Sequence, residues 1–268
     1  MKDTSRKKRL LVSNDDGYQS HFLRLLVDAL VEDFDVCVVA PLEEQSWVGR
    51  AMSRSGTLEA KPVLDWPCPA WSVSGRPADC VNIGLNHLID HTPDAVISGM
   101  NLGFNVSLPL TLGSGTVAAA TEGALAGLPA IAFSLSIPRD EFMQVSQAKG
   151  QRDERGEQIT RIAAEHARKI THKLLGQPHI PYTVHNINFP PQLTEDAPVK
   201  STTMTISRMP SLFTQHTADG DEGGVRRFSF DFARSWHHTY NPETSDIEAV
   251  KRGEISHTTL RWDRLSLT

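Results

Sequence analysis

Residues 9–40 read RLLVSNDDGYQSHFLRLLVDALVEDFDVCVVA and contain one strand–helix–strand unit. The apolar run at residues 9–13 predicts a short buried strand, and residues 22–31 place apolar side chains on one side of a helix. Residues 36–40 predict a second strand, which ends at Pro41. Alternation of strand and helix is typical of a mainly parallel sheet, so this stretch predicts an α/β fold.

The same alternation continues along the chain. Apolar runs at residues 95–98, 130–135 and 182–187 predict further strands. Helical patterns cover residues 77–89 and 116–126, and an amphipathic helix includes residues 159–174. The polar residues 139–157 predict a surface loop that leads into that helix. The fold predicted is a three-layer, Rossmann-like, mainly parallel sheet with helices on both faces.

The pattern changes after residue 190, where apolar residues become sparser. Phe228, Phe230 and Phe232 alternate as in a strand with one buried face. We therefore predict an α/β core over residues 1–190. Residues 191–268 are predicted to form a hairpin-rich C-terminal arm that contacts another subunit and is not an independent domain.

Composition excludes several classes of protein. The chain has 268 residues, of which 22% are charged, and a formal net charge of -5, so it is not expected to bind nucleic acid polymers or an anionic membrane. The basic N-terminal segment is followed by only three apolar residues, which predicts no signal peptide, and no apolar run is long enough to span a bilayer. Three cysteines without CxxC spacing predict a reduced, cytoplasmic protein.

Two adjacent carboxylates follow the first predicted strand, in Asn14-Asp15-Asp16-Gly17. Ligands of open parallel sheets bind beyond the carboxyl ends of the strands, so this is a suitable position for a site. Two ionised carboxylates in a partly closed crevice repel each other unless a cation lies between them. The alternative is a polar turn in which either aspartate caps the next helix. The residues alone leave both interpretations open.

Ser114-Gly115-Thr116 begins the helix of small residues that ends near residue 126. A helix N-terminus attracts anions through its dipole and its free amides, and glycine lets an anion approach the backbone. The alternative is that Ser114 or Thr116 only caps the helix. Gly113-x-Gly115-x-x-Ala118 also fits a dinucleotide-binding pattern. The strand that follows ends without the acidic residue that such a site needs, which disfavours an NAD(P)-dependent oxidoreductase.

Several stretches in a fixed order carry a resemblance to a known family. They are Leu11-Val-Ser-Asn-Asp-Asp-Gly17, Gly75-Arg-Pro-Ala-Asp-Cys-Val81, Ser98-Gly-Met-Asn101 with Gly103 and Asn105, Ser114-Gly-Thr-Val-Ala-Ala-Ala120 with Glu122-Gly123, Asn186-Ile-Asn188, and residues 246–260. Together they span nearly the whole chain. In this respect the chain resembles the SurE family (stationary-phase survival protein E) of metal-dependent nucleotidases.

The resemblance implies a SurE-like fold with an oligomerisation arm and one divalent ion per subunit. The implied metal ligands are Asp15, Asp16, Ser46 and Asn101. All four offer oxygen atoms, which suits Mg²⁺, Mn²⁺ or Ca²⁺.

The resemblance also implies hydrolysis of nucleoside monophosphates to nucleoside and phosphate. This is a 5′-nucleotidase activity, with 3′-nucleotidase and exopolyphosphatase activities as further expectations, in a homodimer or homotetramer. The implied phosphate contacts are Asn105, Ser114, Gly115 and Thr116, and the implied catalytic residues are Asp15, Asp16, Asn105 and Ser114.

The sequence departs from the family pattern near the expected nucleotide pocket. Ser20-His21-Phe22 replaces the usual Ala-Pro-Gly, and Trp47 stands where glycine is usual. Residues 107–109 replace the usual glycine and acidic residues, and Gly113 stands where tyrosine is usual. These departures favour, as an alternative to the enzyme, a catalytically weak or silent member that binds nucleotide or metal.

Overall fold

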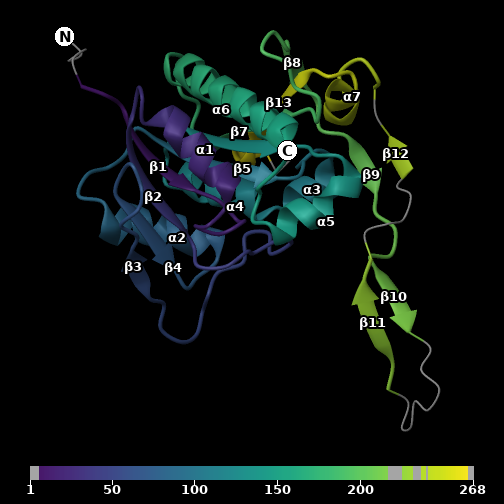
Figure 1. The fold of residues 1–268 in the computed structure, drawn as a ribbon, viewed down its shortest axis with the longest axis horizontal. Coiled ribbons are helices and arrows are strands. Elements are labelled where there is room, and N and C mark those ends of the chain that lie inside the picture. Colours follow the sequence, from purple (N-terminus) through teal and green to yellow (C-terminus); the bar gives the residue numbers. More distant parts are fainter. Residues whose placement is uncertain (1–5, 217–224, 232–236, 240, 265–268) are drawn as a thin grey trace.

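The computed structural model describes residues 6–216, 225–231, 237–239 and 241–264 (Figure 1). Within these residues the central sheet has nine strands in the order β3-β4-β2-β1-β5-β6-β7-β13-β8. Their bounds are β1 Arg9–Ser13, β2 Asp35–Pro41, β3 Ala60–Pro62, β4 Ala70–Val73, β5 Ala95–Leu102, β6 Ala130–Leu135, β7 Thr183–Phe189, β8 Val199–Thr202 and β13 Ile255–Arg261.

Helices cover both faces of this sheet, as the sequence predicts. Alternate side chains of β1 point to opposite faces: Leu10 and Val12 pack in a cluster with α1 and α6, and Leu11 packs with α2 and α4. Burial on both faces explains why β1 is an unbroken apolar run. The helices are α1 His21–Leu30, α2 Pro77–Ile83, which continues as a π-helical turn Gly84–Leu88, α3 Leu108–Gly113, α4 Gly115–Leu125, α5 Arg139–Gln147, α6 Glu154–Leu175 and α7 Asp246–Lys251.

The order in which the chain adds strands to the sheet reverses at β1. It pairs in parallel with β2 on one side and with β5 on the other. The loops that leave the carboxyl ends of β1, β2 and β5 therefore meet at one rim, and a crevice opens where such connections diverge. The predicted α/β fold with a mainly parallel sheet is confirmed.

Residues after 190 divide between the sheet and a projecting arm. Strand β13 runs antiparallel to β7 and parallel to β8, so this part of the chain completes the sheet. Two antiparallel pairs lie outside it and form the arm in Figure 1: β9 Ile206–Arg208 with β12 His237–Thr239, and β10 Phe213–His216 with β11 Arg227–Phe230. The division of the chain at residue 190 stays a prediction.

The expected buried face on the phenylalanine strand is not formed within this chain. Phe228 is 56% exposed and Phe230 is 49% exposed, and Phe232 lies outside the described residues. The reason is that, among the residues described, β11 pairs with β10 alone, in a two-stranded hairpin that projects from the body. A two-stranded ribbon has no second layer to bury its apolar side.

The prediction of a surface loop over residues 139–157 is wrong in its first half, where α5 forms. Asp140 and Glu141 lie in the first turn of α5, where acidic side chains favour the helix dipole, and Val145 is buried. The short α3, the edge strand β3 and its neighbour β4 were also not predicted. In the part of the chain that the structure describes, no helix combines the length and the apolar character needed to cross a membrane.

Candidate active site

The candidate site begins at the turn after β1. The Asn14 side chain donates from Nδ2 to the Gly17 carbonyl at 2.9 Å, which closes the turn. The cap of α1 is Ser20, whose Oγ accepts a hydrogen bond from the Leu23 amide at 3.4 Å. The segment is therefore a turn, but Ser20, and neither aspartate, caps α1, so both carboxylates remain for other roles.

Asp15 is buried between the turn, the loop after β2 and the start of α4. Its Oδ1 accepts a hydrogen bond from the Thr116 hydroxyl at 2.6 Å, and its backbone carbonyl accepts one from the Gln45 amide at 2.7 Å. Burial raises the pKa of Asp15 to about 6, although the hydroxyl and amide of Thr116 favour the charged carboxylate. A hydroxyl has one hydrogen, so Thr116 acts here as a support for Asp15.

The first turn of α4 lies directly against Asp15. A Cβ atom on Gly115 would lie 2.7 Å from the Asp15 Cβ and 3.1 Å from Pro77 Cγ, so only glycine fits there. Ser114 caps α4, because its Oγ accepts a hydrogen bond from the Val117 amide at 3.1 Å. The predicted capping role of Ser114 is confirmed. Its hydroxyl hydrogen is not used in that bond.

Asp16 faces the end of β5. Its Oδ2 accepts a hydrogen bond from the Leu102 amide at 2.8 Å. Burial raises the pKa of Asp16 well above its usual value, and the negative charges of Asp15 and Glu44 raise it further. The negative charges of Asp15 and Glu44 thus make ionisation of Asp16 less favourable. A bound cation would reverse this effect.

Two asparagines lie near the carboxyl end of β5. Asn101 is 8% exposed and donates from Nδ2 to the Gly103 carbonyl at 3.0 Å, which leaves its Oδ1 as an acceptor. Asn105 is buried and donates from Nδ2 to Ser134 Oγ at 2.8 Å. One hydrogen of the Asn105 amide and its oxygen remain for another partner.

Ser46 lies on the loop after β2, which touches the Asp15 turn through Gln45. The Ser46 residue is exposed, and its amide donates to Glu44 Oε1 at 2.9 Å. The structure therefore brings the turn with Asp15 and Asp16, the loop with Ser46 and the end of β5 with Asn101 to one rim of the sheet. Hydrogen bonds from Gln45 to Asp15 and from Leu102 to Asp16 tie these three segments together.

The available atoms fit a hard divalent cation. They are carboxylate, amide and hydroxyl oxygens, which Mg²⁺, Mn²⁺ and Ca²⁺ prefer. The raised pKa values of Asp15 and Asp16 have burial as their first cause, and a cation would offset that penalty. Among the described residues no group of three or more His, Cys, Asp or Glu side chains is arranged to hold a metal, so a site here needs neutral oxygen ligands as well.

Sequence reasoning missed the support beneath Asn105. Strand β7 provides two asparagines that hold the backbone of Asn105. Asn188 Oδ1 accepts a hydrogen bond from the Asn105 backbone amide at 2.7 Å, and Asn186 Nδ2 donates to the Asn105 backbone carbonyl at 2.8 Å. Asparagine at alternate positions of a buried strand puts two amides on one face, which was the available signal. Glu44 was also missed, since nothing in the sequence distinguishes it from Glu43.

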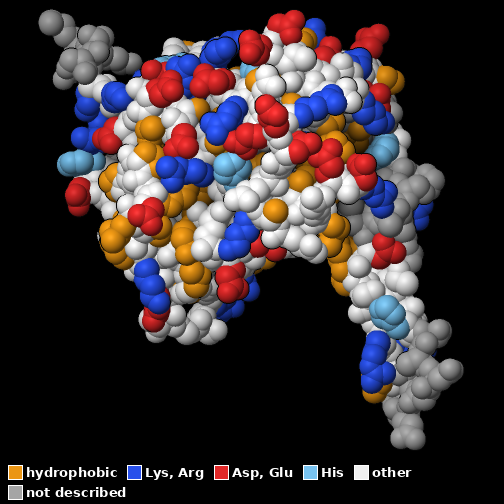
Figure 2. All heavy atoms as spheres, viewed as in Figure 1, with side chains coloured by type: hydrophobic (Ala, Val, Ile, Leu, Met, Phe, Trp, Pro, Cys, Tyr) orange, Lys and Arg blue, Asp and Glu red, His pale blue; other side chains and the backbone are white. Residues whose placement is uncertain are grey.

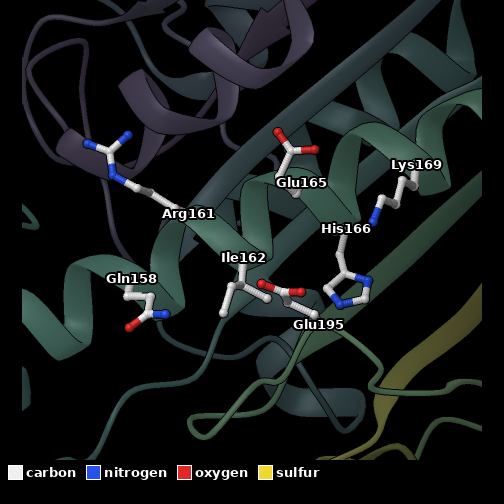
Figure 3. Close-up of a pocket in the computed structure, with 7 residues that line it drawn as sticks. All are labelled: Gln158, Arg161, Ile162, Glu165, His166, Lys169 and Glu195. Carbon is white, nitrogen blue, oxygen red and sulfur yellow. The ribbon is translucent and has the colours of Figure 1, made fainter.

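A separate cavity of about 300 Å³ lies along α6 (Figure 3). Its lining includes His166, whose Nε2 lies 2.9 Å from the Thr194 carbonyl. This contact joins α6 to the segment after β7. The other lining residues are Gln158, Arg161, Ile162, Glu165, Lys169 and Glu195.

Comparison with known proteins places this geometry in a family. A family model described as Survival protein SurE matches residues 10–211. The chain belongs to the SurE family. The crystal structure of SurE protein from Aquifex aeolicus superposes with a TM-score of 0.68 at 28% sequence identity, and the match covers 97% of this chain and 94% of that one.

Curated SurE relatives carry the name 5′-nucleotidase SurE. The relative from Rhodospirillum rubrum is 34% identical over 269 residues, which cover 97% of this chain and 93% of that protein. The relative from Myxococcus xanthus is 41% identical over 189 residues, or 70% of this chain. The matched part spans 64% of the Myxococcus protein and 65% of a relative from Solidesulfovibrio magneticus that is 39% identical.

Proposed function

We propose that this SurE protein is a divalent-metal-dependent 5′-nucleotidase that hydrolyses nucleoside monophosphates to nucleoside and phosphate. One observation carries the proposal: two adjacent carboxylates, the buried Asp15 and the partly buried Asp16, lie at the switch point of the sheet, and the first turn of α4 packs against Asp15. The shared name of the curated relatives supports the same reaction.

Asp15, Asp16, Ser46 and Asn101 would hold one divalent ion, with Mg²⁺, Mn²⁺ and Ca²⁺ as the candidates. Such an ion supplies charge neutralisation at the phosphate oxygens and lowers the pKa of a water that attacks phosphorus. The two aspartates contribute the negative charge that binds it. Thr116 holds Asp15 in place through the 2.6 Å hydrogen bond.

The phosphate group is held at the start of α4. The Ser114 hydroxyl has a hydrogen to donate, and Gly115 lets the phosphate approach the backbone at the positive end of the helix dipole. Asn105 donates its remaining amide hydrogen from the other side of the crevice. These donors stabilise the oxygens on which charge develops during phosphoryl transfer. The Thr116 hydroxyl acts on the phosphate indirectly, through Asp15.

The test is release of phosphate from AMP with Mg²⁺ or Mn²⁺, measured for the wild-type protein, Asp16→Asn and the matched control Asp90→Asn. Asp90 is an exposed residue distant in sequence from the site. Activity is expected in the wild type and the control, and a loss of at least about a hundredfold in Asp16→Asn, because one carboxylate of the ion site becomes neutral. Full activity of Asp16→Asn, or full activity in EDTA, would falsify the proposal.

The same site is expected to accept 3′-monophosphates and short polyphosphates, and the arm is expected to build a homodimer or homotetramer in the cytoplasm. A catalytically silent member of the family would bind AMP and Mn²⁺, detected by a thermal shift, without releasing phosphate. Membership of the SurE family leaves the NAD(P)-dependent alternative without support.

A further inference from the structure

Trp47 is a large aromatic residue that the proposed mechanism does not use. It directly follows Ser46 and has the largest side chain in this loop. The residue is 40% exposed. Its backbone φ is +61°, which is uncommon for a bulky residue and sets the direction of the side chain. The ring therefore occupies a defined place beside the candidate site.

That place is directly over the residue before the phosphate-binding turn. A Cβ atom on Gly113 would lie 3.2 Å from Cε3 of the Trp47 ring. The Gly49 amide donates to the Gly113 carbonyl at 3.0 Å, and Arg50 forms an ion pair of 2.7 Å with Glu122 of α4. The loop that carries Trp47 is thus attached, two and three residues after the ring, to the last residue of α3 and to α4.

The arm completes an aromatic cluster, defined here as Trp47, Phe230 and Phe213. The ring centroids of Trp47 and Phe230 are 5.4 Å apart at 64°, and those of Phe230 and Phe213 are 5.9 Å apart at 81°. Both are edge-to-face contacts, which aromatic rings favour. Figure 2 shows hydrophobic side chains along the inner edge of the arm, toward the hollow between arm and body.

We propose that the face of Trp47 stacks on the nucleobase of the bound nucleoside monophosphate, with Phe230 positioning the indole ring. This inference rests on the proposed function and names what lies beyond the phosphate. The ribose separates base from phosphate, so the base meets residues that flank the phosphate-binding turn, and Trp47 over Gly113 is such a residue.

Stacking on an aromatic ring accepts every base, because each has a π-face, and a larger base gains more contact. The cluster therefore recognises nucleotides as a class and favours purine over pyrimidine monophosphates. A sugar phosphate without a base lacks this interaction and is expected to be a poorer substrate.

The test compares kcat/KM for AMP, UMP and ribose 5-phosphate in the wild type, Trp47→Ala, Trp47→Phe and the control Tyr182→Ala. Tyr182 is also exposed with a positive φ, but it precedes β7 at the opposite end of the strands. In Trp47→Ala the ratio of kcat/KM for AMP to that for ribose 5-phosphate is expected to fall about tenfold. Trp47→Phe should retain most of the ratio, and Tyr182→Ala all of it.

A second readout does not require turnover. Titration with AMP is expected to quench tryptophan fluorescence in the wild type, and the quenching should be lost in Trp47→Phe. If Trp47→Ala lowers activity on AMP and ribose 5-phosphate equally, the ring does not contact the base and the inference is overturned. If the wild type releases phosphate but Trp47→Ala leaves the ratio of kcat/KM for AMP to that for ribose 5-phosphate unchanged, stacking on Trp47 is refuted and the proposed nucleotidase activity stands. No release from any substrate by the wild type would refute the nucleotidase instead.

Discussion

Replacing Thr116 with valine tests whether its hydroxyl supports the proposed metal ligand Asp15 or contacts phosphate directly. The Thr116 residue is fully buried, and valine keeps its branched shape while removing the hydroxyl that donates to Asp15 at 2.6 Å. A hydrogen bond to a charged group contributes about 1.5–3 kcal/mol, and the Thr116 amide still donates to Asp15 in the variant. We therefore take the lower end of that range, about 1.5 kcal/mol.

This loss corresponds to roughly a tenfold weaker binding of Mn²⁺, since about 1.4 kcal/mol changes an equilibrium constant tenfold. Supports of metal ligands commonly have effects of about 10–100-fold. The assay is calorimetric titration of the nucleotide-free protein with Mn²⁺, together with the Mn²⁺ dependence of phosphate release. Thr116→Ser keeps the hydroxyl and should bind Mn²⁺ nearly as the wild type does.

The two roles of Thr116 give different results. If the hydroxyl contacts phosphate directly, Thr116→Val raises the KM for AMP and leaves the affinity for Mn²⁺ as it was. That outcome, or equal affinities for Mn²⁺ in the valine and serine variants with both weakened, would refute the reasoning from the 2.6 Å hydrogen bond.

Three further predictions concern residues around the sheet. Gly115→Ala places a Cβ 2.7 Å from that of Asp15, so urea denaturation should show a loss of about 1–3 kcal/mol and phosphate release should fall with it. Burial lowers the pKa of His185 to about 4 in the folded chain. Below pH 6.5 the His185 imidazole therefore takes up a proton in the unfolded chain before it does in the folded one, and the free energy of unfolding decreases as the pH is lowered. From pH 7 to pH 5 the free energy of unfolding of the wild type should decrease by up to about 2 kcal/mol more than that of His185→Gln, as measured by urea denaturation at both pH values. Asp246→Asn removes a buried carboxylate that accepts hydrogen bonds from the backbone amides of Ser107, Thr205 and Ile247, and should lower the melting temperature by several degrees in calorimetry, a loss of about 1–3 kcal/mol.

Local patterns along the chain were sufficient for the body of the fold. Strand β6 occupies the predicted residues 130–135, and β1 occupies residues 9–13, because a strand buried on both faces is predominantly apolar. The same reasoning placed Asp15 and Asp16 at the rim, since ligand sites of parallel sheets lie beyond the carboxyl ends of the strands.

Where contacts depend on more distant residues, local patterns were insufficient. Helix α5 has a polar sequence and exists because Val145 is buried and its first turn is acidic. Phe228 and Phe230 alternate as in a half-buried strand, yet they lie on a two-stranded arm with no second layer. Alternation records which side of a strand is apolar, but not what covers it.

The candidate site shows the same division. Residue types and their position after strands indicated the acidic pair and the start of α4 before any coordinates were considered. Only the folded chain showed that Thr116 holds Asp15, that Gly115 is glycine because Asp15 packs against it, and that the Trp47 ring lies over Gly113. Each of these contacts joins residues more than sixty positions apart in the chain, and periodicity, which is a property of neighbours, carries no information about them.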